Sequence, residues 1–468
     1  MPAVPWAYPR PAQEGSEFVP DTANGAASVP PRGPAAPRTG LLLFLACLVV
    51  YNANLREVSS QDTMATRILP VIVLVEQRLV LDRFFQGSPV DQPLPYWVQR
   101  VGGHYLSSYP ILPALLALPV YAVPVGLLGG DSWPLINLLA KISATLFAAL
   151  SVLFVYGTAT LLDRQATAVP VALAYAFGTS TWSISSQGLW GHGPAELFMA
   201  AALYAVLRGE TRHGVLQGAG LATGLMVASR PATGVVAVAL LGYVLHRHGR
   251  RGLQSLAAFG LVAVAVLSYN LWAFGSLQGG YAKLHLDQGL HHGVPGAWSA
   301  SMVAGLAGLL LSPNRGLLVY SPVLVLALVG AVLSLRGDRR RLFGYLAGGF
   351  GVSLGILSSY TVWWGGLSFG PRLLTDFLPL LVLFLVPVLQ RPVARTSPAR
   401  VVFALLFALS VAVQAVGAFY YPSPREVDWN TTPRNVDFAP ERLWDWRDTQ
   451  VLRLIRNGPH PPGFGGVS

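Results

Sequence analysis

The stretch Ser59-Ser60-Gln61-Asp62-Thr63 decides how this chain is interpreted. It belongs to a charged segment, residues 54–110, that follows the first apolar run at Leu41–Val50. Only 11 % of the chain is charged, and nearly everything after this segment is apolar. A long hydrophilic segment with an early carboxylate is not the usual layout of a channel or carrier. The position of Asp62 therefore favours an enzyme.

The composition indicates a membrane protein. Of the 468 residues, 53 % are hydrophobic, and the mean hydropathy is +0.50. Apolar runs of about 17–25 residues recur, which is the length that a helix needs to cross about 30 Å of hydrocarbon. The net charge is +11, but the basic residues are scattered between these runs and form no patch with aromatic residues. This distribution is typical of basic inner loops and does not favour nucleic-acid binding.

One segment leaves the topology open. Tyr109–Gly130 is apolar but is interrupted by Pro110, Pro113, Pro119 and Pro124. It either crosses the membrane or lies at the interface as a re-entrant element. If it does not cross, the Arg-rich loops all fall on the cytoplasmic side, as the positive-inside rule requires.

We therefore predict an all-α polytopic membrane protein with about eleven spans, in a range of about ten to thirteen. The N-terminus is expected inside and the C-terminus outside. The expected spans are residues 40–52, 134–161, 166–184, 193–208, 214–229, 231–246, 253–274, 317–335, 342–360, 373–390 and 401–420.

The hydrophilic stretches define the expected domains. Residues 1–39 are rich in Pro, Ala and Gly and are expected to be a disordered cytoplasmic tail. Residues 40–420 form the transmembrane domain, which includes two external loops, 54–133 with amphipathic juxtamembrane helices and 275–316. The external tail, residues 421–468, is aromatic and mixed in charge, so it is expected to pack as a small cap. The protein would lie in the plasma (inner) membrane with its site on the outer face.

Asp62 is the candidate catalytic residue. It comes about ten residues after the first span, where a helix bundle desolvates a carboxylate in part and tunes it as a general base. The alternative is a helix N-cap, because Asp62 precedes the amphipathic run Met64–Arg78 and caps prefer Asp. The two roles are compatible. Arg67, in the same run, is a candidate for substrate binding.

Four further polar residues are candidates for substrate binding. His104 and Tyr109 precede the proline-broken segment, where polar residues usually face a cavity. For His104, an interfacial position without a function is an equal alternative. His192 and Glu196 lie four residues apart on one helix face, and a carboxylate there costs about 2.5–3.5 kcal/mol to insert. This spacing can bind a metal, but no third ligand is evident, so a substrate site or structural hydrogen bonding is the better explanation.

Three arginines lie at span ends on the outer face. Arg230, Arg315 and Arg372 are each next to Gly or Pro, and arginine binds phosphate through paired hydrogen bonds. They could converge on a phosphate; anchoring of helix ends to lipid headgroups is the alternative. Asp376, one turn after Arg372, can pair with it.

Motifs for nucleotide chemistry are absent from the sequence. There is no Walker A motif, no dinucleotide-binding glycine motif, no zinc-ligand spacing and no serine nucleophile elbow. A site on the outer face would also have no access to cytosolic nucleotide sugars. An activated donor must then come from the membrane itself.

Residues 40–420 resemble the polytopic glycosyltransferases of the GT-C fold (glycosyltransferase family 39-like). This group includes the dolichyl-phosphate-mannose protein mannosyltransferases and the bacterial aminoarabinose transferase that acts on lipid A. The resemblance rests on Asp62 directly after the first span, on Tyr109-Pro110 before a proline-rich helix, and on Ala140–Ala144 in the next long span. It implies an inverting transfer of a hexose or pentose from a polyprenyl-phosphate donor to an acceptor hydroxyl.

In that mechanism Asp62 would be the base, and Arg315 and Arg372 would hold the leaving phosphate. Many relatives have Asp-Glu where this chain has Asp62-Thr63, and no Asp-x-Asp metal pair occurs in the loop. No metal ligand and no certain cofactor are therefore predicted, and a divalent cation stays open. The expected partners are the lipid-linked sugar, an acceptor that is protein, lipid or glycan, and membrane lipids.

The alternative function is a transporter or flippase of a lipid-linked or small polar substrate. Two ionisable residues within spans, Lys141 and Glu196, favour it. The long first loop and the lack of paired broken helices near the middle of the membrane argue against it.

Overall fold

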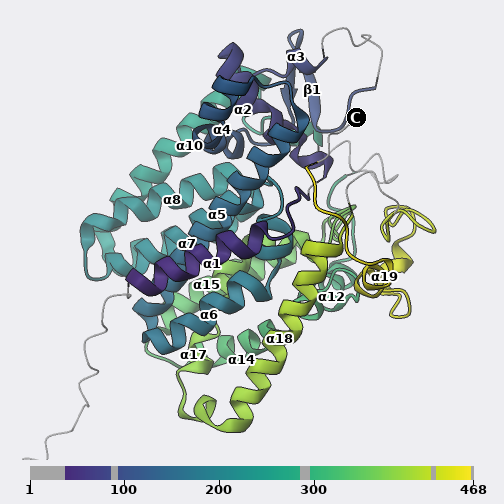
Figure 1. Ribbon diagram of the computed structural model, residues 1–468. Helices are drawn as coiled ribbons and strands as arrows, with labels where there is room; N and C mark the ends of the chain where they lie inside the picture. Colours follow the sequence, from purple (N-terminus) through teal and green to yellow (C-terminus); the bar gives the residue numbers. More distant parts are fainter. Residues whose placement is uncertain (1–36, 59, 86–92, 285–295, 423–427, 465–468) are drawn as a thin grey trace, which may run out of the picture. The chain divides into compact units, whose positions relative to one another are not determined.

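The computed structural model describes residues 37–58, 60–85, 93–284, 296–422 and 428–464, and this part of the chain is mostly helical (Figure 1). The α-helices are α1 (Pro37–Asn52), α2 (Met64–Glu76), α3 (Asp82–Phe85), α4 (Leu112–Leu128), α5 (Trp133–Leu162), α6 (Gln165–Gly178), α7 (His192–Gly209), α8 (Leu216–Ser229), α9 (Gly234–His248), α10 (Leu253–Phe274), α12 (Met302–Leu311), α13 (Leu317–Tyr320), α14 (Val325–Ser334), α15 (Arg340–Ser358), α16 (Leu378–Leu383), α17 (Val386–Leu389), α18 (Ser397–Tyr420) and α19 (Gln450–Asn457). The shorter helical turns are η1 (Gln61–Thr63), η2 (Thr181–Ser185), η3 (His213–Val215), η4 (Pro231–Thr233), η5 (Gly249–Gly252), η6 (Pro322–Leu324), η7 (Arg372–Phe377), η8 (Pro392–Arg395) and η9 (Pro440–Trp444). The strands are β1 (Val98–Val101) and β2 (His104–Ser107).

The helices agree with the predicted all-α membrane fold. Within the described ranges, 5 helical segments are long and apolar enough to cross a membrane, namely Trp133–Leu162, Pro231–Phe274, Arg340–Ser358, Arg372–Leu389 and Ser397–Tyr420. Shorter apolar helices are Pro37–Asn52, Leu112–Leu128, Met302–Leu311 and Pro322–Ser334. Every predicted span contains helix, although several are broken by short turns. The chain is an integral membrane protein, and the count of about eleven spans stays a prediction.

The long helix α5 is the centre of the helix bundle. It packs against α1, α6 and α7, and α7 in turn packs against α8 (Figure 1). Pro134 in the first turn of α5 fits a helix start, where no backbone N–H is needed. Small residues such as Ala140, Ala144 and Ala148 are buried along α5, which allows neighbouring helices to come close.

The helices α8 and α10 are in close contact through a glycine. A Cβ built on Gly220 of α8 would lie 1.9 Å from the carbonyl oxygen of Ser255 in α10. The Ser255 hydroxyl also donates a hydrogen bond to Leu216 O, at 2.6 Å. The absence of a side chain at Gly220 therefore sets the distance between the two helices.

We predict that Gly220→Ala separates α8 from α10 and lowers the free energy of unfolding by about 1–3 kcal/mol, because the added methyl group overlaps backbone atoms. Thermal unfolding in lipid nanodiscs measures this effect. Gly218→Ala is the matched control, because Gly218 is exposed on the same helix and its Cβ would meet no atom within 4 Å. Equal melting temperatures for the two variants would contradict the prediction.

The segment 54–133 contains a hairpin that we did not predict. The strands β1 and β2 pair antiparallel, with Val101 opposite His104. Gly102 and Gly103 connect them with φ of 59° and 88°, and two consecutive positive φ angles are the requirement of a tight hairpin turn. Amphipathic juxtamembrane helices were expected in this loop, and α2, α3 and α4 are helical. The helix α4 continues through both Pro119 and Pro124.

The C-terminal residues 428–464 pack onto two loops of the helix bundle. The Asn314 side chain donates to Arg442 O at 3.0 Å, and the Trp364 indole donates to Asp437 at 2.7 Å. The side chain of Gln450, at the start of α19, donates to Ser368 O at 3.0 Å. Residues 428–464 are called the C-terminal cap below.

Candidate active site

Asp62 lies in η1, between the first helix and α2. The hydroxyl of Ser60 accepts a hydrogen bond from the Asp62 backbone N–H at 3.2 Å, so Ser60 caps this turn. The alternative role of Asp62 as the N-cap of α2 is wrong, because Thr63 occupies that position. Its carboxylate instead accepts a hydrogen bond from the Tyr96 hydroxyl and forms an ion pair with Arg372. The Asp62 side chain is 17 % exposed.

The surroundings keep Asp62 ionised. Burial alone would raise the pKa of this carboxyl group, but the charge of Arg372 and the hydrogen bonds from Tyr96 and Arg372 favour the carboxylate, so the pKa lies below its usual value. Burial and the nearby Asp62 charge raise the pKa of Tyr96, which keeps this phenol a hydrogen-bond donor. At neutral pH the site therefore presents a carboxylate that can accept a proton.

Arg372 begins η7, directly after the loop 363–371. Its Nη2 donates to Gly365 O at 2.5 Å, and its Nη1 contacts Asp62. The guanidinium carbon lies 5.0 Å from the centroid of the Trp190 ring, so the arginine also stacks on an aromatic face. Its Nε is buried and has no hydrogen-bond partner among the described residues. Gly365 has a φ of 78°, which a residue with a side chain rarely adopts.

Asp376 joins two other residues of the site. It is fully buried; its Oδ1 lies 2.7 Å from His192 Nδ1, and its Oδ2 accepts a hydrogen bond from Arg230 Nε at 3.2 Å. The expected pairing of Asp376 with Arg372 is wrong, because η7 is a 3₁₀ helix. With about three residues per turn, residues four apart point to different sides. Arg372 thus pairs with Asp62, and Arg230 pairs with Asp376.

Asp62, Tyr109, Arg230 and Arg372 line one cavity of about 1750 Å³. The structure therefore brings together four of the predicted residues. His192 borders a second, smaller cavity whose wall also includes Asp62 and Arg230.

The wall of the large cavity consists of three groups of residues. Aromatic side chains surround its polar end: Tyr96, Tyr281, Trp298 and Tyr360. An apolar wall comes from α8, α9 and α10: Leu225, Ala228, Val235, Leu261, Val262 and Val266. The C-terminal cap contributes Asp428, Thr431 and Asp437.

Several of these residues were not predicted. Tyr96, Tyr281 and Tyr360 come from three different segments, and tyrosines near a membrane surface are common without any site. Trp190 directly precedes the Gly191-His192 pair, but nothing in the sequence indicates that its ring stacks on Arg372. Only contacts between distant segments reveal these roles.

Arg315 does not line the cavity, in contrast to its predicted role at the phosphate. It is 1 % exposed, and its guanidinium donates to Trp364 O (2.9 Å), Gly366 O (3.1 Å) and Asn430 Oδ1 (2.6 Å). Its hydrogen-bonding groups are therefore used inside the protein. Arg315 connects the cap to the loop 363–371, which leads to Arg372.

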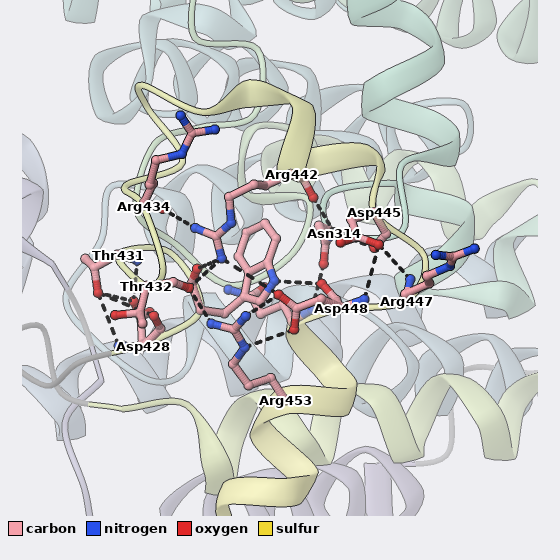
Figure 2. A network of polar contacts seen from close by, with 12 residues as sticks. Asn314, Asp428, Thr431, Thr432, Arg434, Arg442, Asp445, Arg447, Asp448 and Arg453 are labelled. Atoms are coloured by element: carbon pink, nitrogen blue, oxygen red, sulfur yellow. Dashed lines mark hydrogen bonds and ion pairs between the residues drawn. The ribbon is translucent and has the colours of Figure 1, made fainter.

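The C-terminal cap is held together by its own charged residues (Figure 2). The guanidinium carbon of Arg442 lies 4.6 Å from the Trp429 ring centroid, and that of Arg315 lies 5.5 Å from it. Arg453 donates from Nε to Asp448 at 3.0 Å (Figure 2). Gln450 accepts a hydrogen bond from Gly370 N at 3.1 Å, two residues before Arg372. The cap thus helps to fix the loop that positions Arg372.

We predict that Arg315→Lys loosens the cap. Lysine cannot reach the separate carbonyl groups that the arginine fork binds, and buried acceptors left without donors cost about 2–4 kcal/mol of unfolding free energy in total. Limited proteolysis should then cleave residues 428–464 faster than in the wild type. Arg447→Lys, at an exposed arginine of the same cap, serves as the control and should match the wild type. Equal cleavage in all three proteins would contradict the prediction.

Three predicted site residues lie away from the cavity wall. Arg67 is on the buried side of α2, where it donates to Asn137 at 2.8 Å and pairs with Glu57 at 3.2 Å. His104 is 56 % exposed in the hairpin and pairs with Asp82 at 2.7 Å. Glu196 is fully buried within α7, one turn beyond His192, and accepts a hydrogen bond from Thr181 at 2.9 Å.

These contacts favour structural roles for Arg67, His104 and Glu196. His192 and Glu196 do not share one site, because His192 contacts Asp376 whereas Glu196 accepts a hydrogen bond from Thr181. Within the described segments, no group of three or more His, Cys, Asp or Glu is placed to hold a metal ion.

Part of the chain matches a family of known proteins. Residues 127–272 match the model of the dolichyl-phosphate-mannose-protein mannosyltransferase family. This segment contains His192 and Arg230, whereas Asp62 and Arg372 lie outside it. No curated protein matches the chain in sequence.

Solved structures with a similar arrangement include an oligosaccharyltransferase of Archaeoglobus fulgidus in complex with zinc and sulfate, at 11 % identity and a TM-score of 0.49, covering 92 % of this chain and 58 % of that one. The same organism's oligosaccharyltransferase AglB, in complex with an inhibitory peptide and a dolichol-phosphate, has 12 % identity and a TM-score of 0.49, covering 92 % and 61 %. The arabinofuranosyltransferase AftD from mycobacteria has 14 % identity and a TM-score of 0.39, covering 83 % and 27 %.

The chain spans about three-fifths of the length of the archaeal enzymes. The matched segment begins at the end of α4 and continues into α10. The match of residues 127–272 to this family model confirms the predicted resemblance over this segment.

Proposed function

We propose that the chain is a glycosyltransferase that transfers a sugar from a polyprenyl-phosphate donor to an acceptor hydroxyl. The observation that carries this proposal is the composition of the cavity. Its polar end holds the carboxylate of Asp62 with Arg230 and Arg372, and an apolar wall from α8 to α10 continues from it. A ligand with a phosphate and a hydrocarbon chain matches such a cavity. The family of residues 127–272 is named for a donor of this class.

In the proposed reaction, Asp62 is the general base. Its carboxylate accepts the proton of the acceptor hydroxyl while the hydroxyl oxygen attacks the anomeric carbon of the donor. The bond from that carbon to the phosphate oxygen breaks, and the polyprenyl phosphate leaves with the bonding electrons. A single displacement of this kind inverts the anomeric configuration.

The two arginines act on the leaving group. Negative charge grows on the phosphate as the bond breaks, and positive groups fixed in a partly dry cavity stabilise that charge. Arg230 is held by Asp376, and Arg372 is held by Gly365 and the Trp190 ring. We place this site on the outer face of the membrane, because the basic loops are expected inside.

The experiment uses the purified chain in nanodiscs with a panel of radiolabelled polyprenyl-phosphate sugars and a membrane extract as acceptor. We expect release of polyprenyl phosphate and transfer of label for at least one donor. In sealed vesicles, transfer should occur only to acceptor on the outer side. Passage of an unmodified substrate across the vesicle membrane, without transfer, would contradict the proposal and support a transporter.

A further inference from the structure

We propose that Arg372 serves two anions in turn, pairing with Asp62 before donor binds and with the donor phosphate afterwards, so that Asp62 is released as a base only in the donor complex. This inference rests on the proposed function. It adds a coupling between binding of the donor and activation of the base.

The first observation is the contact between the two residues. Asp62 and Arg372 form an ion pair inside the cavity, and their side chains are 17 % and 14 % exposed. The arginine that would bind phosphate is thus the same group that neutralises the proposed base. A phosphate in the cavity competes with Asp62 for this guanidinium.

The second observation is how Arg372 is held. Its guanidinium stacks on the Trp190 ring at 5.0 Å, and Nη2 is bound to Gly365 O. Its buried Nε has no hydrogen-bond partner among the described residues, so the edge of the guanidinium retains a donor for a further acceptor. The contact with the Trp190 ring does not depend on the direction of a hydrogen bond, so it permits the guanidinium to rotate. Arg372 can therefore turn from one anion toward another.

The other arginine of the cavity is held differently. Arg230 donates to Asp376 through Nε, and Asp376 also contacts His192 and is fully buried. Binding of a phosphate at Arg230 would therefore not disturb the ion pair between Asp62 and Arg372. Only Arg372 links the phosphate site to the base.

The groups that face Asp62 decide whether its pKa rises or falls when the donor binds. They are Tyr96 from the segment before β1, Tyr109 from the segment before α4, and Arg372 from η7. The charges of Arg230, Asp428 and Asp437 and the phenols of Tyr281 and Tyr360 also border the cavity. Arg372 is the cation in direct contact, and it lowers the pKa of Asp62 against the effect of burial. When Arg372 turns to the phosphate, burial remains, so the pKa of Asp62 rises and the carboxylate becomes a stronger base.

The test measures protonation of Asp62 directly. Infrared difference spectra of the protein in nanodiscs are recorded against pH, with and without decaprenyl phosphate, and Asp62→Asn identifies the carboxyl band. We expect the midpoint of Asp62 protonation to rise by about one pH unit or more when decaprenyl phosphate is bound.

Two variants separate the causes. Arg372→Gln should show a raised midpoint without lipid and no further rise at saturating lipid. Arg230→Gln should keep the wild-type midpoint without lipid, because Arg230 pairs with Asp376 and not with Asp62. A rise that persists in Arg372→Gln would assign the effect to the charge of the phosphate itself and overturn the inference.

Binding of the lipid is measured separately, by its effect on the melting temperature. Lipid that binds the wild type without moving the Asp62 midpoint would overturn the inference and leave the proposed function intact. Lipid that does not bind at all would overturn the proposed function and this inference together.

Discussion

Asp62→Asn is expected to lower the rate of sugar transfer by about 10²- to 10⁴-fold, which is the range that a positioned general base contributes. The amide has the shape of the carboxylate but cannot accept the proton of the acceptor hydroxyl. Tyr96 and Arg372 remain next to it, so the fold should be retained. Single-turnover release of polyprenyl phosphate, at donor concentrations above KM, measures the chemical step.

A control for this substitution lies in the same loop. The Asp131 side chain is 82 % exposed, pairs with Arg83 and does not line the cavity. Asp131→Asn removes the same charge and should transfer at the wild-type rate. If Asp62→Asn were as active as Asp131→Asn, Asp62 could not be the base.

Arg372→Lys is expected to reduce kcat by about 10²-fold or more, comparable to the loss of one donor that stabilises a developing anion. Lysine keeps the charge but cannot contact Asp62, bind Gly365 O and stack on Trp190 at the same time. Because the phosphate charge grows in the transition state, kcat should fall more than KM rises. Steady-state kinetics with varied donor concentration separate the two terms.

The matched control for Arg372 is Arg100→Lys. Arg100 is exposed in β1, and its guanidinium carbon lies 5.9 Å from the Tyr105 ring, outside the cavity wall. Arg100→Lys also removes an arginine that lies near an aromatic ring, but this variant should leave kcat and KM unchanged. A loss in KM alone for Arg372→Lys would indicate ground-state binding and contradict the proposed role.

The helices could be predicted because their signals are local. Apolar runs and basic loops recur at the spacing that a membrane imposes. The helices α5 and α10 lie within one residue of the expected ranges, and α18 begins four residues before its expected start and ends where expected. The hairpin of β1 and β2 was missed, because its strands are short and its signal is mainly the pair Gly102-Gly103.

The candidate site could be predicted only in part. Asp62, Arg230 and Arg372 are polar residues at the ends of apolar segments, and that position is visible in the sequence. Arg315 also lies at the end of an apolar segment, but its side chain binds the C-terminal cap and the loop 363–371 instead of lining the cavity. The partners of Asp376 were not predictable, because they depend on the turn geometry of η7 and on contacts with residues more than a hundred positions away.

The most direct test of the account is a cryo-EM structure of the chain in nanodiscs with decaprenyl phosphate. We predict that the phosphate lies within hydrogen-bond distance of Arg230 and Arg372, next to Asp62, with the prenyl chain along α8 and α10. A phosphate bound elsewhere, with these arginines still paired only to Asp376 and Asp62, would contradict the proposed site.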